Sequence, residues 1–284
     1  MKVRQGETPG EKLLIAVAYA LLIAWAVASL FPLYWMAITA IKPSTLVITT
    51  PPELIPSQVT WRNFRVLLNS GVARWTLNSL LVAGAVTLAQ ILFASMAGYA
   101  FAKKQFPGKE LLFWIYVSSM MVPIYALIVP LYRMMSAFHL LDTYAALILP
   151  GVAAPFGVFL MRQFIQTLPT ELIDAARIDG CSELAVYSRI IVPLAAPGLA
   201  VLGIFTFSDQ WASFFWPLVV TGSRDMRVLT VGIASLQSFD VTSGMKDYGV
   251  MMAGATWMAI PMFLIFFLSQ RYFVRGITLG ALKG

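Results

Sequence analysis

The sequence predicts an all-α membrane protein with six transmembrane helices, and three observations indicate this fold class. Only 12% of the 284 residues are charged and 59% are hydrophobic, whereas about 25% of a soluble domain is charged. The few charges are segregated, and six charge-free segments are each as long as the ~17–25 residues that a helix needs to cross a bilayer. These segments are apolar on all sides and lack a period of two, which excludes a membrane β-barrel.

The whole chain is expected to form one transmembrane domain, residues 1–284. The expected spans lie at approximately residues 13–41, 76–102, 110–134, 143–164, 194–220 and 248–272. An external segment at 43–74 separates the first two spans, a long polar loop at 165–193 separates the fourth and fifth, and a short tail at 273–284 ends the chain.

The connections carry recognisable turn signals. Pro51, Pro52 and Pro56 are expected to hold the external segment extended, before a short interfacial helix that begins near Trp61. Pro107-Gly108 predicts the turn between the second and third spans.

Prolines also lie within the third span, at Pro123 and Pro130. A proline at such depth kinks a helix and frees backbone carbonyls, which only neighbouring protein or a water-lined path can satisfy. This span is therefore expected to face a pathway or the interior of the helix bundle. The alternative is a structural kink without a function.

The loop from Glu171 to Pro193 is the one long polar interruption between two apolar spans, and its pattern predicts two short helices. Thr170 is expected to cap the first helix, with Glu171 in the first turn where the helix dipole favours an acid. Gly180 is expected to end this helix with a positive φ. Ser182 is expected to cap a second helix that leads to Pro193.

The loop has the features of a surface that another protein contacts. Ala175 and Ala176 offer a face without bulk, and the flanking charges have both signs, as in the polar rim of an interface. The alternative is an amphipathic hairpin lying on lipid headgroups. That alternative explains neither the small residues nor the presence of four acidic residues beside anionic lipid.

The distribution of Lys and Arg predicts the orientation. If the chain has six spans, 12 of its 20 basic residues lie on the side of the termini and 8 on the other side. The positive-inside rule then places both termini and the 165–193 loop in the cytoplasm. The basic residues lie at the ends of the segments, which favours contact with lipid headgroups and excludes a nucleic-acid partner.

Several classes of chemistry are excluded by composition. With one cysteine, Cys181, and one histidine, His139, the chain has neither an internal disulfide nor a conventional metal site. It contains no phosphate-binding Gly-x4-Gly-Lys-Ser/Thr loop and no recognisable catalytic motif, so we do not expect an enzyme.

The polar loop also resembles a known motif. Asp174-Ala175-Ala176, three residues, Gly180, nine residues and then Ile190-Ile191-Val192-Pro193 is similar to the EAA loop of bacterial ABC-importer permeases. That pattern reads Glu-Ala-Ala, three residues, Gly, nine residues and Ile-x-Leu-Pro, so Asp174 and Val192 are conservative departures.

The resemblance covers nearly the whole chain. Phe31–Trp35, Ile41–Pro43, Met121–Pro123, Pro130–Tyr132, Leu141–Tyr144 and Gln270–Gly284 are similar to the carbohydrate-importer subfamily, and specifically to the second of two permease subunits of maltose-type systems. The fifth span departs from it. The subfamily's Trp-Asn-Asp/Glu-Phe is Trp211-Ala212-Ser213-Phe214 here.

The resemblance implies a sugar or polyol permease of a bacterial or archaeal cytoplasmic membrane. Its partners would be a dimer of ATPase subunits that hold ATP and Mg, a second homologous permease and an external sugar-binding protein. This chain would bind no cofactor. Contacts to the ATPase would come from the loop and from the C-terminal tail, through Glu171, Asp174, Ala175, Ala176, Asp179, Gly180, Ile190, Pro193, Gly280, Ala281, Leu282 and Lys283.

The fifth span supplies a candidate substrate path. An ionised carboxylate at the depth of Asp209 is costly unless it faces protein or water. Asp209 is therefore hypothesised to accept hydrogen bonds from sugar hydroxyls, with Trp211, Phe214 and Trp216 as aromatic neighbours. The alternatives are a structural hydrogen bond to a partner subunit and placement in the outer aromatic belt.

Two alternative functions stay open on the sequence alone. A stand-alone ion-coupled carrier would show more ionisable groups within the membrane than Asp209. An ABC importer of a non-sugar solute would share every feature of the polar loop.

Overall fold

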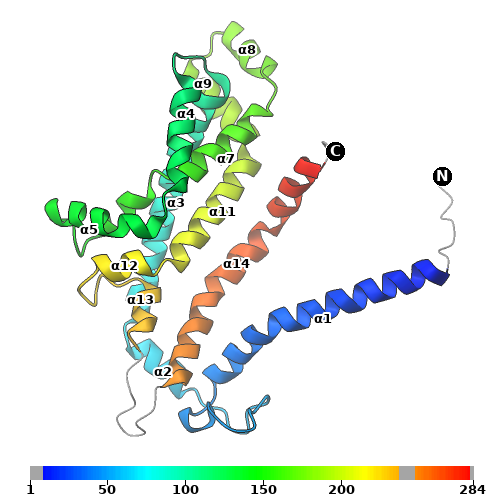
Figure 1. Cartoon of the computed structure of the whole chain (residues 1–284), viewed down its shortest axis with the longest axis vertical. Coiled ribbons are helices and arrows are strands. Elements are labelled where there is room, and N and C mark those ends of the chain that lie inside the picture. Colours follow the sequence, from blue (N-terminus) through cyan, green and yellow to red (C-terminus); the bar gives the residue numbers. More distant parts are fainter. Residues whose placement is uncertain (1–8, 237–246, 282–284) are drawn as a thin grey trace. The chain divides into compact units, whose positions relative to one another are not determined.

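The computed structural model describes residues 9–236 and 247–281, with the side chains of residues 9, 11 and 271–281 left out (Figure 1). Its described residues are helical and contain no strand, as predicted. The α-helices are α1 (Pro9–Ala40), α2 (Arg62–Asn69), α3 (Val72–Lys103), α4 (Lys109–Ser118), α5 (Ile128–Ala137), α6 (Tyr144–Ile148), α7 (Pro155–Gln166), α8 (Glu171–Ile178), α9 (Glu183–Val186), α10 (Val192–Leu194), α11 (Ala196–Ala212), α12 (Phe215–Val220), α13 (Leu229–Ala234) and α14 (Tyr248–Ala281).

The chain divides into two compact units. Unit 1 comprises Met1–Ser70 and Leu236–Trp257, and unit 2 comprises Gly71–Ser235 and Met258–Gly284. Within unit 2, α8 and α9 lie at one end and α12 and α13 at the other (Figure 1).

Three described helices are long and apolar enough to cross a bilayer. They cover Lys12–Ala40, Val72–Lys103 and Tyr248–Gln270. Three further pairs of helices qualify only when each bent pair is taken as one span. The pairs are Lys109–Met121 with Ile124–Ala137, Tyr144–Gly151 with Pro155–Gln166, and Glu183–Leu194 with Ala196–Ala212, bent by 92°, 42° and 76°. Six spans are reached on that count.

The expected span at 110–134 is not one continuous helix. The chain breaks after a 3₁₀ turn at Ser119–Met121 and resumes in another at Ile124–Leu127. Pro123 explains the break, because it lacks the N–H that the next helical turn would need. Pro130 causes no second break, since it lies in the first turn of α5, where the missing N–H is not required.

The expected span at 194–220 is also divided. Helix α11 ends at Ala212, Ser213 is extended with φ −61° and ψ 130°, and α12 begins at Phe215. The freed carbonyl of Ser213 accepts a hydrogen bond of 2.6 Å from the Thr230 hydroxyl. This side-chain donor satisfies the backbone at the break, as a bilayer environment requires.

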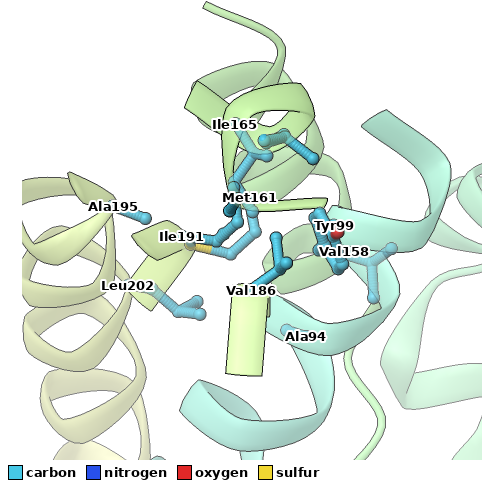
Figure 2. Packing of buried hydrophobic residues seen from close by; sticks show 11 residues of the cluster. Ala94, Tyr99, Val158, Met161, Ile165, Val186, Ile191, Ala195 and Leu202 are labelled. Atoms are coloured by element: carbon cyan, nitrogen blue, oxygen red, sulfur yellow. The ribbon is translucent and has the colours of Figure 1, made fainter. Parts of the chain in front are cut away.

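The core of unit 2 is the contact of α3 with α7 and α11. One hydrophobic cluster joins Ala94 and Tyr99 of α3, Val158, Met161 and Ile165 of α7, and Leu202 of α11 (Figure 2). The helices α3 and α7 approach closely at Gly98. A Cβ at Gly98 would lie 2.6 Å from Met161 Cβ and 2.9 Å from the Arg162 nitrogen.

Unit 1 contains α1, the external segment and α2, and a buried amide holds it together. Asn63 Nδ2 donates to the carbonyls of Ala40 and Lys42 at 2.9 and 2.8 Å. Arg62 forms an ion pair of 2.8 Å with Asp247. The short helix predicted near Trp61 is present as α2, which begins at Arg62 and ends at Asn69.

We predict that Gly98→Ala lowers the apparent Tm of the purified protein, because its methyl group must push α3 and α7 apart. Overpacking of this kind costs about 1–3 kcal/mol. The matched control is Gly84→Ala in the same helix, where a Cβ would meet nothing within 4 Å. Since alanine is the better helix former, Gly84→Ala should keep or raise the Tm. Equal Tm values for the two variants would contradict the packing account.

Candidate functional site: the polar loop and the cavity at the end of α11

Helix α8 begins the polar loop, but Thr170 does not cap it as predicted. Thr170 has helical backbone angles, and its side chain makes no cap hydrogen bond. Its hydroxyl instead accepts from Lys103 Nζ at 3.1 Å, and the same ammonium donates to the Leu168 carbonyl at 2.6 Å. A residue from the end of α3 thus fixes the entrance to the loop.

Gly180 ends α8 as predicted, with φ 78°. The Gly180 N–H bonds to the Arg177 carbonyl at 3.0 Å, and the Cys181 N–H bonds to the Ala176 carbonyl at 2.9 Å. This pair of bonds is a Schellman motif, in which the left-handed residue is usually glycine. Any side chain at Gly180 would be strained by its φ, although the space around it is open.

The second short helix, α9, begins as predicted. The Ser182 hydroxyl accepts from the Ala185 N–H at 3.3 Å and caps it. A π-helical turn at Tyr187–Ile191 follows and leads through α10 to α11. Of the predicted motif residues here, Ile190 is half-buried and Pro193 is exposed.

One face of the loop is part of the protein core. Ile173, Ala176, Val186 and Ile191 belong to the α3–α7–α11 cluster, and Figure 2 shows Val186 and Ile191 beside Met161. Ala176 is only 6% exposed. The two alanines of the motif therefore do not share an open face: Ala176 packs inward and Ala175 faces outward.

The opposite face is exposed, and we call it the coupling surface: Glu171, Leu172, Asp174, Ala175, Ile178, Asp179 and Leu184. Its apolar side chains are unusually open. Ile178 is 87% exposed and Leu184 69%. An apolar centre with a polar, charged rim is typical of a protein interface.

Glu183 ties the two short helices to α3. Its carboxylate forms ion pairs with Lys104 and, at 3.3 Å, with Arg177 of α8. It also accepts from the Tyr99 hydroxyl at 3.2 Å. Lys104 and Tyr99 are far from Glu183 in the chain, so the sequence alone does not indicate these contacts.

An ion pair between Arg162 and Glu110 at this end of unit 2 was also not predicted from the sequence. The guanidinium of Arg162 donates to both carboxylate oxygens of Glu110 at 2.8 and 2.9 Å, and lies 3.8 Å from the centre of the Phe113 ring. Arg162 is 8% exposed. It thereby joins α7 to α4 with a buried cation that has both a charge partner and an aromatic face.

A separate cavity of about 480 Å³ lies where α11 ends. Its wall includes Asp209, Gln210, Ala212, Ser213, Phe214 and Trp216, and, from beyond the Pro123 break, Ile124 and Tyr125. Gln210 Nε2 donates to Asp209 Oδ2 at 3.3 Å. The volume is in the range of ~300–1,000 Å³ that small-molecule sites occupy.

Of the predicted path residues, the structure brings Asp209, Phe214 and Trp216 together at this cavity. Trp216 donates its indole N–H to the Ala146 carbonyl at 2.9 Å. Trp211 does not line the cavity. It is 1% exposed, stacks on Phe207 and donates to the Met258 carbonyl at 3.1 Å, so its role here is structural.

Comparison with known families assigns the chain. Residues 90–279 match the binding-protein-dependent transport system inner membrane component family. The chain belongs to this family. It is therefore a membrane component of an ABC importer and a transport subunit rather than an enzyme, which replaces the alternative of a stand-alone ion-coupled carrier.

Curated relatives of this permease match over almost their whole length. The arabinooligosaccharides transport system permease protein AraQ of Halalkalibacterium halodurans is 36% identical, with 95% of this chain and 96% of that protein covered. The sn-glycerol-3-phosphate transport system permease protein UgpE of Yersinia pestis is 34% identical, with 92% and 94% covered.

A solved structure shares the fold of the permease. A chain from the crystal structure of a bacterial ABC transporter involved in the import of the acidic polysaccharide alginate superposes with a TM-score of 0.83. It is 21% identical, and the match covers 95% of this chain and 99% of that one.

The predicted contacts of the C-terminal tail are only partly covered by the structure. Of the predicted tail residues, Gly280 and Ala281 belong to α14, which continues past the predicted end at residue 272. Their side chains, and Leu282 and Lys283 altogether, lie outside the described residues. Among the residues whose side chains are described, no group of three or more His, Cys, Asp or Glu residues could hold a metal ion.

The Glu183 interactions depend on pH in a known direction. The hydrogen bond from Lys104 is the largest cause that lowers the pKa of Glu183 below its ordinary value of 4.5, and the charge of Arg177 acts in the same direction. A carboxyl with a lowered pKa stabilises the fold above its ordinary pKa, and this contribution is lost as the pH falls through the lowered value. The attachment of the loop is therefore intact at neutral pH.

We predict that Glu183→Gln loosens the loop at pH 7, raising hydrogen exchange of residues 171–186 by about fivefold, the factor for ~1 kcal/mol from exposed ion pairs. Lowering the pH below 4.5 should raise exchange in the wild type, after correction for the intrinsic rate, and leave Glu183→Gln unchanged. Glu171→Gln, the same chemical change on the coupling surface, is the control. A similar effect of both variants would contradict a special role for Glu183.

Proposed function

We propose that this chain is one of two permease subunits of a sugar-importing ABC transporter, and that an ATPase subunit docks on its coupling surface. The observation that carries the proposal is the two-sided construction of the α8–α9 loop. Its inner face is built into the transmembrane core, while Ile178 and Leu184 project from its outer face. A partner that displaces the outer face of such a loop would therefore also displace α3, α7 and α11.

The exposed apolar residues supply affinity, and the charges supply specificity. Burying a side chain such as Ile178 contributes about 1.5–3 kcal/mol, which is ten- to a hundredfold in affinity. The rim carries both signs of charge, with Glu171 and Asp179 beside an ion pair of 3.3 Å between Asp174 and Arg177, which favours a partner of complementary charge pattern. These properties fit a protein socket better than a hairpin resting on headgroups.

The partners follow from the same proposal. ATP and Mg would be held by the ATPase dimer, since this sequence contains no phosphate-binding loop. A second permease would complete the translocation path, and an external binding protein would deliver the solute, in keeping with the binding-protein-dependent family. The C-terminal residues Gly280, Ala281, Leu282 and Lys283 are proposed as a second contact to the ATPase.

The proposed solute class is a sugar or polyol. Relatives named for arabinooligosaccharides and for diacetylchitobiose, the latter the permease protein NgcG of Streptomyces coelicolor, support it. The aromatic and carboxylate lining of the cavity at Asp209 also fits a polyhydroxylated ligand.

We propose that both termini and the coupling surface face the cytoplasm. The bias of basic residues supports this orientation, and unit 2 places α8–α9 and α12–α13 at opposite ends.

Cys181 makes the orientation testable, because it is the only cysteine and is exposed beside Gly180. We predict that a membrane-impermeant maleimide labels Cys181 in inverted membrane vesicles and not in intact spheroplasts. Cys181→Ser is the control for labelling of other proteins. Labelling in sealed spheroplasts would place the loop outside and refute the orientation.

We predict that Ile178→Ser weakens ATPase binding by tenfold or more and abolishes solute-stimulated ATP hydrolysis in proteoliposomes. The control is Ile55→Ser, because Ile55 is 80% exposed but lies in the external segment. Ile55→Ser should keep the ATPase bound. Unchanged co-purification and coupled transport in Ile178→Ser would show that the coupling surface is not the docking site.

A further inference from the structure

The cavity at the end of α11 carries one sign of charge. Asp209 is its one acidic residue, and among the described residues that line it there is no Lys, Arg or His. Asp209 is exposed, and its carboxylate accepts a hydrogen bond from the neutral amide of Gln210. A solute that enters the cavity therefore meets the negative charge of Asp209, and none of the described lining residues is a cation.

The end of helix α11 adds to the negative electrostatic potential around Asp209. Asp209 lies in the last turn of α11, a helix of 17 residues. The C-terminal end of a helix carries partial negative charge, so an acid in this turn is unfavourable for the helix itself. The stability of α11 therefore does not explain a carboxylate at this position. The charge of Asp209 and the partial negative charge of the helix end add to one another.

The other lining groups suit a neutral polyhydroxylated solute. Tyr125 packs edge-on against Phe215 with ring centres 5.4 Å apart, and Trp216 is held by its bond to Ala146. Fixed aromatic faces offer apolar contact to the C–H face of a sugar ring. A carboxylate accepts hydroxyl protons in charge-assisted hydrogen bonds, which are stronger than neutral ones.

We propose that this cavity selects solutes by charge, so that Asp209 admits neutral sugars and polyols and excludes phosphorylated or uronate solutes. The inference rests on the proposed permease function and narrows its solute class. It separates this chain from a transporter for sn-glycerol 3-phosphate, which one of its relatives is named for, since a phosphate would meet Asp209 without a compensating cation.

The test compares how fast a cysteine in the cavity reacts with a cationic and an anionic reagent, so it does not need the natural solute. Ala212, which also lines the cavity, is three residues after Asp209 on α11, so their Cβ atoms are ~5–6 Å apart on one helix face. Ala212→Cys in a Cys181→Ser background gives a single thiol there. The assembled transporter in proteoliposomes is then treated with a trimethylammonium or a sulfonate methanethiosulfonate reagent, both without nucleotide and with ATP and vanadate.

The cationic reagent should react about tenfold faster than the anionic one, relative to a free thiol in solution, because the Coulomb energies with Asp209 have opposite signs. Adding Asp209→Asn should reduce the ratio to that of the free thiol. Asp225→Asn, the same change at an exposed residue that does not line the cavity, should leave it unchanged.

A ratio that Asp209→Asn does not change would overturn the proposal, and so would a thiol that neither reagent reaches in either nucleotide state. Vanadate-sensitive ATP hydrolysis by the same preparations reports the proposed permease function separately. The cavity and the coupling surface share no residue. A reactivity ratio that does not depend on Asp209, with ATP hydrolysis retained, therefore refutes only this inference.

Discussion

The close packing of α3 on α7 is the contact on which the rest of unit 2 depends. At Gly98 the two helices approach so closely that even a methyl group would overlap Met161. The cluster around this contact includes the inner face of the α8–α9 loop, through Ile173 and Ala176, and α11, through Leu202. Interiors packed at this density are resistant to small deformations. A displacement of the loop is therefore shared by three membrane helices and is not absorbed locally.

The cavity exists because two helices break. Pro123 interrupts the third expected span, and the extended backbone at Ser213 interrupts the fifth. A bilayer tolerates such breaks only where the freed backbone groups find partners or face a water-filled space. Some partners are identifiable: Thr230 serves the Ser213 carbonyl, and Ser119 serves that of Tyr116. Residues directly after both breaks line the cavity, together with Leu147, Pro150 and Gly151 from α6 and the turn that follows it.

Local signals predicted local structure well, whereas contacts between distant segments escaped them. The helical class, the left-handed Gly180 and the Ser182 cap follow from composition and from neighbouring residues. Thr170 failed as a cap because its backbone is already helical, and its hydroxyl instead accepts from Lys103 of another helix. The burial of Ala176 and the contacts of Glu183 with Tyr99 and Lys104 likewise depend on how α3 packs. For the cavity, sequence reasoning found Asp209 from the cost of its charge, but it could not separate the buried Trp211 from Trp216, since both are aromatic residues near the end of one span.

Helix α11 joins the two functional regions of unit 2 into one mechanical element. It starts directly after Ala195, which is buried in the same cluster as the α8–α9 loop, and it ends at Ala212 in the cavity wall. At 1.5 Å per residue, a straight 17-residue helix is about 26 Å long. A buried hydrogen bond of 2.9 Å from Thr206 to Gln90 connects it to α3 along the way. Because a hydrogen-bonded helix does not stretch, tilting its start at the loop must move Asp209 at its end. The position of the loop is thereby coupled to the geometry of the cavity through the π-helical turn, α10 and the 76° bend that connect α9 to α11.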